Sequence, residues 1–292
     1  MKYLSVDSLK KKFTEMHPGA VVTQGQYSIQ SYCSSLDLEW NQMDQEHRPF
    51  IHSTYLKSVR VWTQEEAQFS LSLIKILGIS FYTLVTDVRI KKGVYCQSFS
   101  FFNLIYVHAL TECSDDLHKG EWFIFSHWVL KPLHYFINKK MLALNERQNP
   151  EDVPLRKKRF ELRHQGYRFA PDENLNFLTA NTSNHNVIYP TAHSLLKVKL
   201  SEITETPKRF TNNLIDVILC RDNDGQTLAW HAVCPHEGGP LAEGSFCERQ
   251  LTCPWHGFQF SPVILGKDEV VQKLQNLSIR QQGDEVVISS GQ

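Results

Sequence analysis

The segment CPHEGGPLAEGSFCERQLTCPWHGFQF, residues 234–260, indicates the architecture of the C-terminal part of the chain. It contains Cys234-Pro-His236 near its start and Cys253-Pro-Trp-His256 near its end, so each of two short loops offers one thiolate and one imidazole. With 7 Cys and 13 His in 292 residues, this pair of patterns is expected only about 0.001 times by chance. We therefore expect a metal centre held by Cys234, His236, Cys253 and His256.

The order of the ligands indicates the kind of centre. Zinc sites commonly pair Cys with Cys and His with His at each knuckle, whereas a Rieske cluster needs two Cys on one iron and two His on the other. Two loops that each carry one Cys and one His meet the second need if they grip the cluster from opposite sides. Gly238, Gly239 and Gly257 let backbone amides approach the cluster, and Pro240 and Pro254 stiffen the loops. Zinc remains the alternative.

Residues 216–260, with CPHEGGPL and CPWHGFQF, resemble Rieske [2Fe-2S] domains. Neither loop has the extra cysteines of the respiratory-complex Rieske proteins, so the chain is more similar to the ferredoxin and oxygenase branch. Glu237 stands where oxygenases often have Arg, a difference that affects either the potential of the cluster or its docking surface. The resemblance implies a [2Fe-2S] cluster on the four residues named above.

Hydrophobic patterns divide the chain into two parts. Before residue 170 they predict a short helix ended near His47 by Pro49, long antiparallel strands, and two helices separated by a break at Asn149-Pro150. After residue 187, short strand-like runs between turn signals indicate an all-β domain. The fold class is therefore α+β, with domains at 1–186 and 187–292 joined by a linker over about 170–190. The predicted ranges are helix 36–47, strands within 55–129, and helices 132–146 and 151–164.

A second candidate site lies in the first domain. Asp44, His47 and His52 have the spacing DxxHxxxxH. Asp44 and His47 share a helix face, and a break at Pro49 lets His52 turn back toward the same point. Two imidazoles could then meet one metal while Asp44 bonds the far nitrogen of one of them. Without further context, the preferred explanation of this pattern is a solvated helix end rich in polar residues.

The second pattern also resembles the mononuclear iron motif of Rieske oxygenases. The resemblance implies His47 and His52 as iron ligands and Asp44 as the bridge that carries an electron from a Rieske histidine, here His256. A 2-His-1-carboxylate triad needs one carboxylate, which in the family comes from a late helix. Asp152 is the better match and Glu151 the alternative, although acidic residues at a helix start are also favoured by the helix dipole.

The resemblance further implies a START-like helix-grip fold for the first domain. Several apolar residues on its predicted strands could line a hydrophobic pocket or simply form core. The basic run from Arg156 to Arg159 fits a solvated helix face better than a targeting or docking signal. The strand residues in question are Phe69, Leu71, Phe81, Phe99, Phe101 and Tyr106.

Composition limits the remaining possibilities. Lys and Arg total 31, as do Asp and Glu, which disfavours a general nucleic-acid role. The longest apolar run, from Leu71 to Val85, contains Lys75 and is too short and too charged to cross a bilayer. The N-terminus lacks a signal-peptide pattern, so no membrane span and a cytoplasmic location are expected.

The leading hypothesis is a Rieske non-haem iron oxygenase that hydroxylates or demethylates a small organic substrate with O₂. No GxGxxG or other nucleotide-cofactor signature occurs in the chain, so a separate reductase or ferredoxin supplies the electrons. The cluster domain follows the catalytic motif instead of preceding it as in the family, and electron transfer between neighbouring subunits would suggest a homotrimer. The alternatives are a Rieske electron carrier fused to a domain that binds a hydrophobic ligand, and a regulatory redox sensor.

Overall fold

Two compact units make up the computed structural model. It describes residues 6–16, 18–19, 21–30, 32–64, 67–76, 78–91, 94–101, 104–114, 117–170, 185–266 and 270–291. Among these residues, the first unit ends at Phe160 and the second begins at Glu161. Most of the expected linker lies outside the described residues, and a functional boundary at 186/187 stays a prediction.

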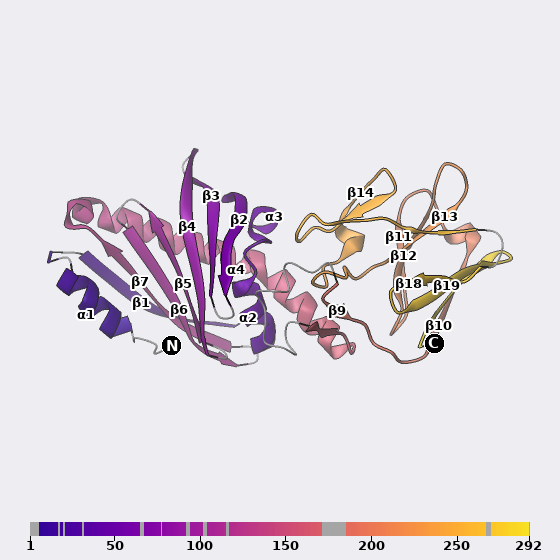
Figure 1. Cartoon of the computed structure of the whole chain (residues 1–292), viewed down its shortest axis with the longest axis horizontal. Helices are drawn as coiled ribbons and strands as arrows, with labels where there is room; N and C mark the ends of the chain where they lie inside the picture. The colour runs from indigo at the N-terminus through magenta and orange to yellow at the C-terminus, as the bar shows by residue number, and fades with distance from the viewer. Residues whose placement is uncertain are drawn as a thin grey trace. The chain divides into compact units, whose positions relative to one another are not determined.

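The first unit is built on one seven-stranded antiparallel sheet with the strand order β1-β7-β6-β5-β4-β3-β2. Figure 1 shows the long helix α4 running across its strands. The helices are α1 Val6–Met16, α2 Ser35–Met43, α3 Arg48–Ile51 and α4 His134–His164, with a 3-10 turn at Trp128–Leu133. The strands are β1 Val21–Gln30, β2 Tyr55–Gln64, β3 Ala67–Ile76, β4 Ile79–Lys91, β5 Val94–Phe101, β6 Leu104–Ser114 and β7 Leu117–Ser126.

The two faces of β3 and β4 differ from the predicted apolar lining. Leu71 and Leu84 pair across these strands and are exposed at 37% and 42%. Most of the residues that alternate with them are buried and polar, among them Ser70, Ser72 and Asp87, although the apolar Val85 is buried on the same face. Leu71 was expected either to line a hydrophobic pocket or to form core, and its exposure contradicts the expectation of a core position. The side chains of Phe99, Phe101 and Tyr106 lie outside the described residues.

Two predicted helix boundaries are also wrong. The first helix ends at Met43, because Asp44 is extended at its C-cap, and Pro49 lies in the first turn of the separate helix α3. Proline is favoured there, since the first helical N–H groups have no partner within the helix. Asp44 and His47 consequently lie in the connection between two helices and do not share one helix face.

The predicted break at Asn149-Pro150 does not occur, because α4 continues through Pro150 and Pro154. A proline inside a helix removes a backbone hydrogen bond. The guanidinium of Arg156 donates to the backbone carbonyl of Asn149 at 3.0 Å and to its side-chain oxygen at 2.8 Å. A side chain thus satisfies polar groups close to the two prolines.

The second unit is all-β. Two four-stranded sheets, β10-β20-β19-β18 and β11-β12-β13-β17, enclose a core that includes Val217, Leu219, Ile279 and Ile288. A three-stranded sheet, β14-β15-β16, and the pair β8-β9 complete it. The strands are β8 Arg168–Phe169, β9 Val187–Ile188, β10 Ser194–Lys199, β11 Lys208–Thr211, β12 Asp216–Arg221, β13 Thr227–His231, β14 Ser245–Cys247, β15 Gln250–Thr252, β16 Gln259–Phe260, β17 Val263–Leu265, β18 Gln272–Leu274, β19 Leu277–Gln282 and β20 Glu285–Ser290, with 3-10 turns at Leu200–Glu202 and Leu241–Glu243.

The predicted α+β class is confirmed: a helix-grip, START-like sheet domain is followed by an all-β domain. None of the helices in the described ranges is both long and apolar enough to span a membrane.

Candidate metal centres

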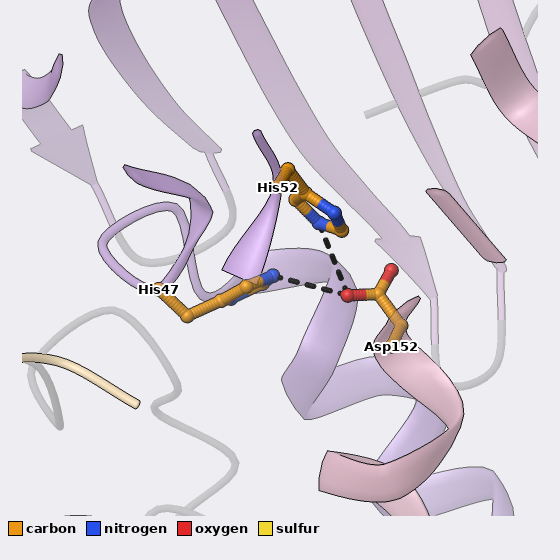
Figure 2. A group of neighbouring side chains, drawn as sticks. All are labelled: His47, His52 and Asp152. Carbon is orange, nitrogen blue, oxygen red and sulfur yellow. Dashed lines mark ion pairs between the residues drawn. The ribbon is translucent and has the colours of Figure 1, made fainter. Parts of the chain in front are cut away.

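Three side chains from distant parts of the first unit converge on one point. Figure 2 shows His47, His52 and Asp152 turned toward one another, with the aspartate at one side of the two imidazoles. Oδ1 of Asp152 lies 3.3 Å from Nε2 of His47 and 3.1 Å from Nε2 of His52. One potential ligand atom from each residue falls within 4.8 Å of the others. Two imidazole nitrogens and one carboxylate are the donor set of a facial triad, so these residues fit an iron ion.

The first histidine, His47, is buried between two carboxylates. Its Nδ1 lies 3.3 Å from Oδ2 of Asp44, on the opposite side of the ring from Asp152. Burial by itself lowers the pKa of His47, but hydrogen bonds to Asp152 and Asp44 outweigh this effect and raise the pKa to about 9. Burial raises the pKa of Asp152, and hydrogen bonds from His47 and His52 reverse this and hold it below its usual range. Without a metal, a proton on His47 therefore occupies the space between the ligands.

The second histidine, His52, also meets a different group with each ring nitrogen. Its backbone caps the end of α3, where the N–H donates to the carbonyl of Arg48 at 2.9 Å. Its Nε2 faces Asp152, whereas its Nδ1 lies 2.8 Å from Oε2 of Glu151. Of the two carboxylates considered as third ligand, only Asp152 thus contacts both histidines on the side where the ligand atoms converge.

Arginine side chains fix α4, which carries Asp152, against α2. The guanidinium of Arg159 lies 4.1 Å over the ring of Trp40 and 3.6 Å from Asp37, and all three residues are at most 1% exposed. Arg156 is equally buried. The expectation of a solvated basic helix face is therefore wrong for both arginines, because aromatic and carboxylate groups of α2 and a polar group of α4 itself satisfy them. Lys157 in the same run is exposed, as expected.

The three converging residues line one side of a cavity of about 530 Å³ in the first unit. The rest of its wall comes from α2, α3, β1, β2, β5, β7 and the middle of α4. Such a volume suits a small organic molecule. An ion held by His47, His52 and Asp152 would thus face the interior of the cavity.

Two aromatic rings in the cavity wall lie against glycines of the neighbouring strand. Trp122 pairs with Gly25 and Tyr27 pairs with Gly120 across β1 and β7. A Cβ atom at Gly25 would be 2.6 Å from the ring of Trp122, and one at Gly120 would be 2.3 Å from the hydroxyl of Tyr27. Glycine at these positions lets both rings lie close to the sheet, and this leaves room inside the cavity.

The two ligand loops of the second unit share one pattern of backbone hydrogen bonds. The first loop, 233–240, follows β13, and the second, 253–258, joins β15 to β16. The N–H groups of Cys234 and Cys253 each donate, at 2.8 Å, to a carbonyl five residues later. The N–H groups of Gly238 and Gly257 each donate, at 2.9 Å, to the carbonyl of the cysteine in the same loop. These glycines have φ of +85° and +70°, values that residues with a Cβ atom disfavour.

This shared loop geometry places the two histidines next to each other and the two cysteines next to each other. The rings of His236 and His256 are 4.7 Å apart between centroids, with their Nδ1 atoms 3.3 Å apart. A hydrogen bond from Cys234 lowers the pKa of Cys253 to about 7, against the effect of burial, whereas burial raises the pKa of Cys234. The backbone N–H groups of His236 and Glu237 are directed at one sulfur, and those of Trp255 and His256 at the other. Two paired sulfurs with amide donors and two paired imidazoles fit a Rieske cluster.

Glu237, which follows the proposed ligand His236, is hydrogen-bonded within the second unit. It is buried, and its Oε1 accepts a hydrogen bond from Nδ2 of Asn186 at 3.3 Å. The backbone N–H of Asn186 in turn donates to the carbonyl of Pro235 in the same loop, at 2.9 Å. The glutamate therefore belongs to the hydrogen bonding around the first ligand loop.

Some residues around the first site had no separate sequence signal. The contacts of Trp122 with Gly25 and of Tyr27 with Gly120 depend on the register of strands far apart in the chain. A detectable signal was available for Arg147, which precedes Glu151 by four residues, the spacing of an ion pair on a helix.

Comparison with known proteins identifies the second unit. Residues 195–279 match the family model of the Rieske [2Fe-2S] domain. A related stretch occurs in choline monooxygenase from the chloroplast of Arabidopsis thaliana, which is 33% identical over 85 residues. This similarity covers 28% of the chain and 20% of the relative, and the spinach (Spinacia oleracea) choline monooxygenase matches at 32% with 28% and 19% coverage. The chain thus spans about a fifth of the length of these curated relatives.

Among solved structures, norcoclaurine synthase from Thalictrum flavum is similar over 47% of the chain and 96% of its own length, with a TM-score of 0.37 and 8% identity. The terminal oxygenase of carbazole 1,9a-dioxygenase from Novosphingobium sp. KA1 is similar over 50% of both chains, with a TM-score of 0.33 and 9% identity. The match of residues 195–279 to the family model shows that the chain carries a Rieske [2Fe-2S] domain, which follows a helix-grip sheet domain.

Proposed function

We propose that the protein is a Rieske-type non-haem iron oxygenase. The observation that carries this proposal is the convergence of His47, His52 and Asp152 beside a cavity, in a chain that also has a Rieske domain. A cluster alone would serve an electron carrier. A second donor set, which suits iron and lines a cavity, provides a site where electrons from the cluster would be consumed in a reaction.

In this proposal the residues of the first unit divide the work. His47, His52 and Asp152 hold Fe(II), which when bound supplies the means of activating O₂. Asp44 orients His47 through Nδ1 and provides the connection to a cluster histidine, for which His256 is the matching residue. The cavity, whose wall includes the three proposed iron ligands, would bind a small organic substrate. Hydroxylation and demethylation are both compatible with this ligand set.

Electrons must come from outside the chain, because its sequence has no flavin or nicotinamide signature. We propose a separate reductase or ferredoxin as donor and a homotrimer as the assembly. The relatives matched by the Rieske domain are named choline monooxygenases, so choline is the first substrate to test. Because the similarity is confined to the cluster domain, a panel of small aromatic acids belongs beside it.

The test uses the protein with its cluster reduced under anaerobic conditions and Fe(II) added. Exposure to ¹⁸O₂ should place ¹⁸O in a hydroxylated member of the aromatic panel. Aldehyde products, such as oxidised choline or the formaldehyde of a demethylation, exchange their oxygen with water and are therefore quantified without the label. The His47→Ala/His52→Ala double variant should keep the reduced cluster and form no product. If the iron-loaded protein consumes no more O₂ than the double variant with any compound, the electron-carrier alternative is favoured.

A further inference from the structure

The proposed iron site raises the question of what Glu151 does beside Asp152. The two carboxylates are neighbours in α4, and their side chains meet opposite edges of the same imidazole. Oε2 of Glu151 is 2.8 Å from Nδ1 of His52, and Oδ1 of Asp152 is 3.1 Å from Nε2. An imidazole binds a metal through one nitrogen and needs a hydrogen-bond acceptor for the other. Glu151 supplies that acceptor on the side of the ring away from the converging ligand atoms.

We propose that Glu151 is a positioning residue for His52 and not an iron ligand, an inference that rests on the proposed function of this site. Its carboxylate fixes the proton of His52 on Nδ1, which leaves the lone pair of Nε2 for the metal. It also restrains the rotation of the ring, because contacts at both ring nitrogens hold it, at 2.8 Å from Glu151 and 3.1 Å from Asp152. His47 has the same arrangement, with Asp44 at 3.3 Å from its Nδ1. Each histidine of the triad therefore has a carboxylate of its own.

Glu151 is itself held by Arg147. The Nε of Arg147 lies 3.3 Å from Oε1 of Glu151, and an Nη2–H of the same guanidinium donates to the hydroxyl of Ser53 at 2.5 Å. Ser53 follows His52 directly in the chain. Ser53 contacts Arg147, Arg147 contacts Glu151, and Glu151 contacts the ring of His52. This series of contacts therefore begins and ends at two adjacent residues, Ser53 and His52. We infer that Arg147 uses this bridge to attach the middle of α4 to the segment that carries the histidine.

The test measures metal binding without catalysis. In protein that retains its [2Fe-2S] cluster, a chelator first empties the mononuclear site, and Co(II) is then titrated while its d–d absorption is recorded. Glu151→Ala should weaken Co(II) binding by about 10- to 100-fold and leave the shape of the spectrum close to wild type, because the ligands are unchanged. Asp152→Ala should change the spectrum itself, because a ligand is lost.

Glu151→Gln separates positioning from simple attraction between charges. The amide oxygen still accepts from Nδ1–H, so this variant should bind Co(II) within about fivefold of wild type. Glu146→Ala, which removes an exposed carboxylate from the same helix beside the cavity, is the control for charge. Equal losses of Co(II) affinity in Glu151→Gln and Glu151→Ala would overturn the proposal, because they would show that only the negative charge of Glu151 matters. Unchanged affinity in Glu151→Ala would overturn it as well.

A spectroscopic signature adds a readout that a change in stability alone does not move. In the Co(II) protein in H₂O, the Nδ1–H protons of both histidines should give cobalt-shifted signals that disappear in D₂O. In Glu151→Ala, one of the two should exchange much faster, while Arg147→Ala should have a smaller effect. If Glu151→Ala abolishes the spectrum and Asp152→Ala retains it, Glu151 is the ligand and the proposal is wrong.

The proposal and the oxygenase function can fail separately. If the wild-type protein binds no Co(II) at this site, both are overturned. If Co(II) binds and the variants behave as expected but no substrate is oxygenated with iron, the positioning role stands and the oxygenase function fails.

Discussion

Arg159 of α4 lies over the ring of Trp40 of α2, with 4.1 Å between the guanidinium carbon and the ring centroid. The guanidinium also lies 3.6 Å from the buried carboxylate of Asp37. A desolvated guanidinium gains from both an aromatic face and a carboxylate. This contact connects the helix of Asp152 to the helix that leads into Asp44 and His47.

Removing this guanidinium should destabilise the first unit and its metal site together. We expect Arg159→Ala to lower the free energy of unfolding by about 3 kcal/mol, because the buried carboxylate of Asp37 loses a positively charged neighbour. Urea titrations of the two proteins measure the change. Lys157→Ala, an exposed neighbour in the same helix, should cost no more than about 0.5 kcal/mol. Similar losses in both variants would show that the buried contact has no special weight.

Metal binding at the first site should depend strongly on pH. In the metal-free protein the pKa of His47 is about 9, so an ion must displace a proton at any lower pH. The apparent affinity for a divalent metal should therefore rise about tenfold per pH unit up to pH near 9 and then level. Calorimetric titrations in buffers of different ionisation enthalpy count the released proton. An affinity that is constant between pH 7 and 9 would contradict this account.

The raised pKa of His47 should make the metal-free protein less stable as pH rises, whereas its affinity for metal increases. The folded-state pKa of His47 is raised from 6.5 to about 9, so the protonated histidine stabilises the fold fully below pH 6.5. This contribution should be lost as pH rises from 6.5 through 9. Melting temperatures of the metal-free protein across this range should fall more steeply than those of His47→Gln. Parallel curves would mean that His47 does not carry the proton.

A methyl group at Gly25 should reduce the cavity. Its Cβ would lie 2.6 Å from the ring of Trp122, and the ring can yield only by rotating away from the sheet. We expect Gly25→Ala to weaken binding of a two-ring probe such as naphthoate by at least about tenfold, while benzoate is affected much less. Titration calorimetry with the metal-free protein gives both affinities. Unchanged naphthoate binding would show that the Trp122 ring does not set the depth of the cavity.

Gly257 should be needed for the cluster. Its φ of +70° is unfavourable for residues with a Cβ atom, and its N–H closes the second ligand loop on Cys253. Gly257→Ala should lower the unfolding free energy by about 1 kcal/mol and speed the loss of the cluster's visible absorbance. Gly225 has a comparable φ of +76° with open space around it, so Gly225→Ala is the control that should retain the cluster. Equal cluster loss in both variants would contradict a specific role for Gly257.

The parts of this structure that the sequence predicted well are those set by local spacing. The backbone hydrogen bonds that close each ligand loop lie within that loop, so the spacing around Cys234 and Cys253 could be recognised from sequence, while their role as cluster ligands stays a prediction. The pattern of Asp44, His47 and His52 was also local, and the structure brings these residues together with Asp152. The fold class followed from the change between helical and strand periodicity.

The parts that were missed depend on contacts between distant residues. Pro49 was interpreted as a helix end, but it begins a second helix, and Pro150 does not interrupt α4. Arg159 belonged to an apparently solvated basic run and is buried, because Trp40 and Asp37 are brought to it by the packing of α2. A single-sequence pattern does not contain these partners, so neither burial nor helix continuity could be predicted there.

The proposed oxygenase function requires that one chain carries both a Rieske cluster and a mononuclear iron. The most direct test counts iron and acid-labile sulphide in anaerobically purified protein reconstituted with Fe(II), for wild type and for His47→Ala/His52→Ala. We expect about three irons and two sulphides per wild-type chain, and about two irons with an unchanged cluster spectrum in the double variant. About two irons in both proteins after reconstitution would contradict it.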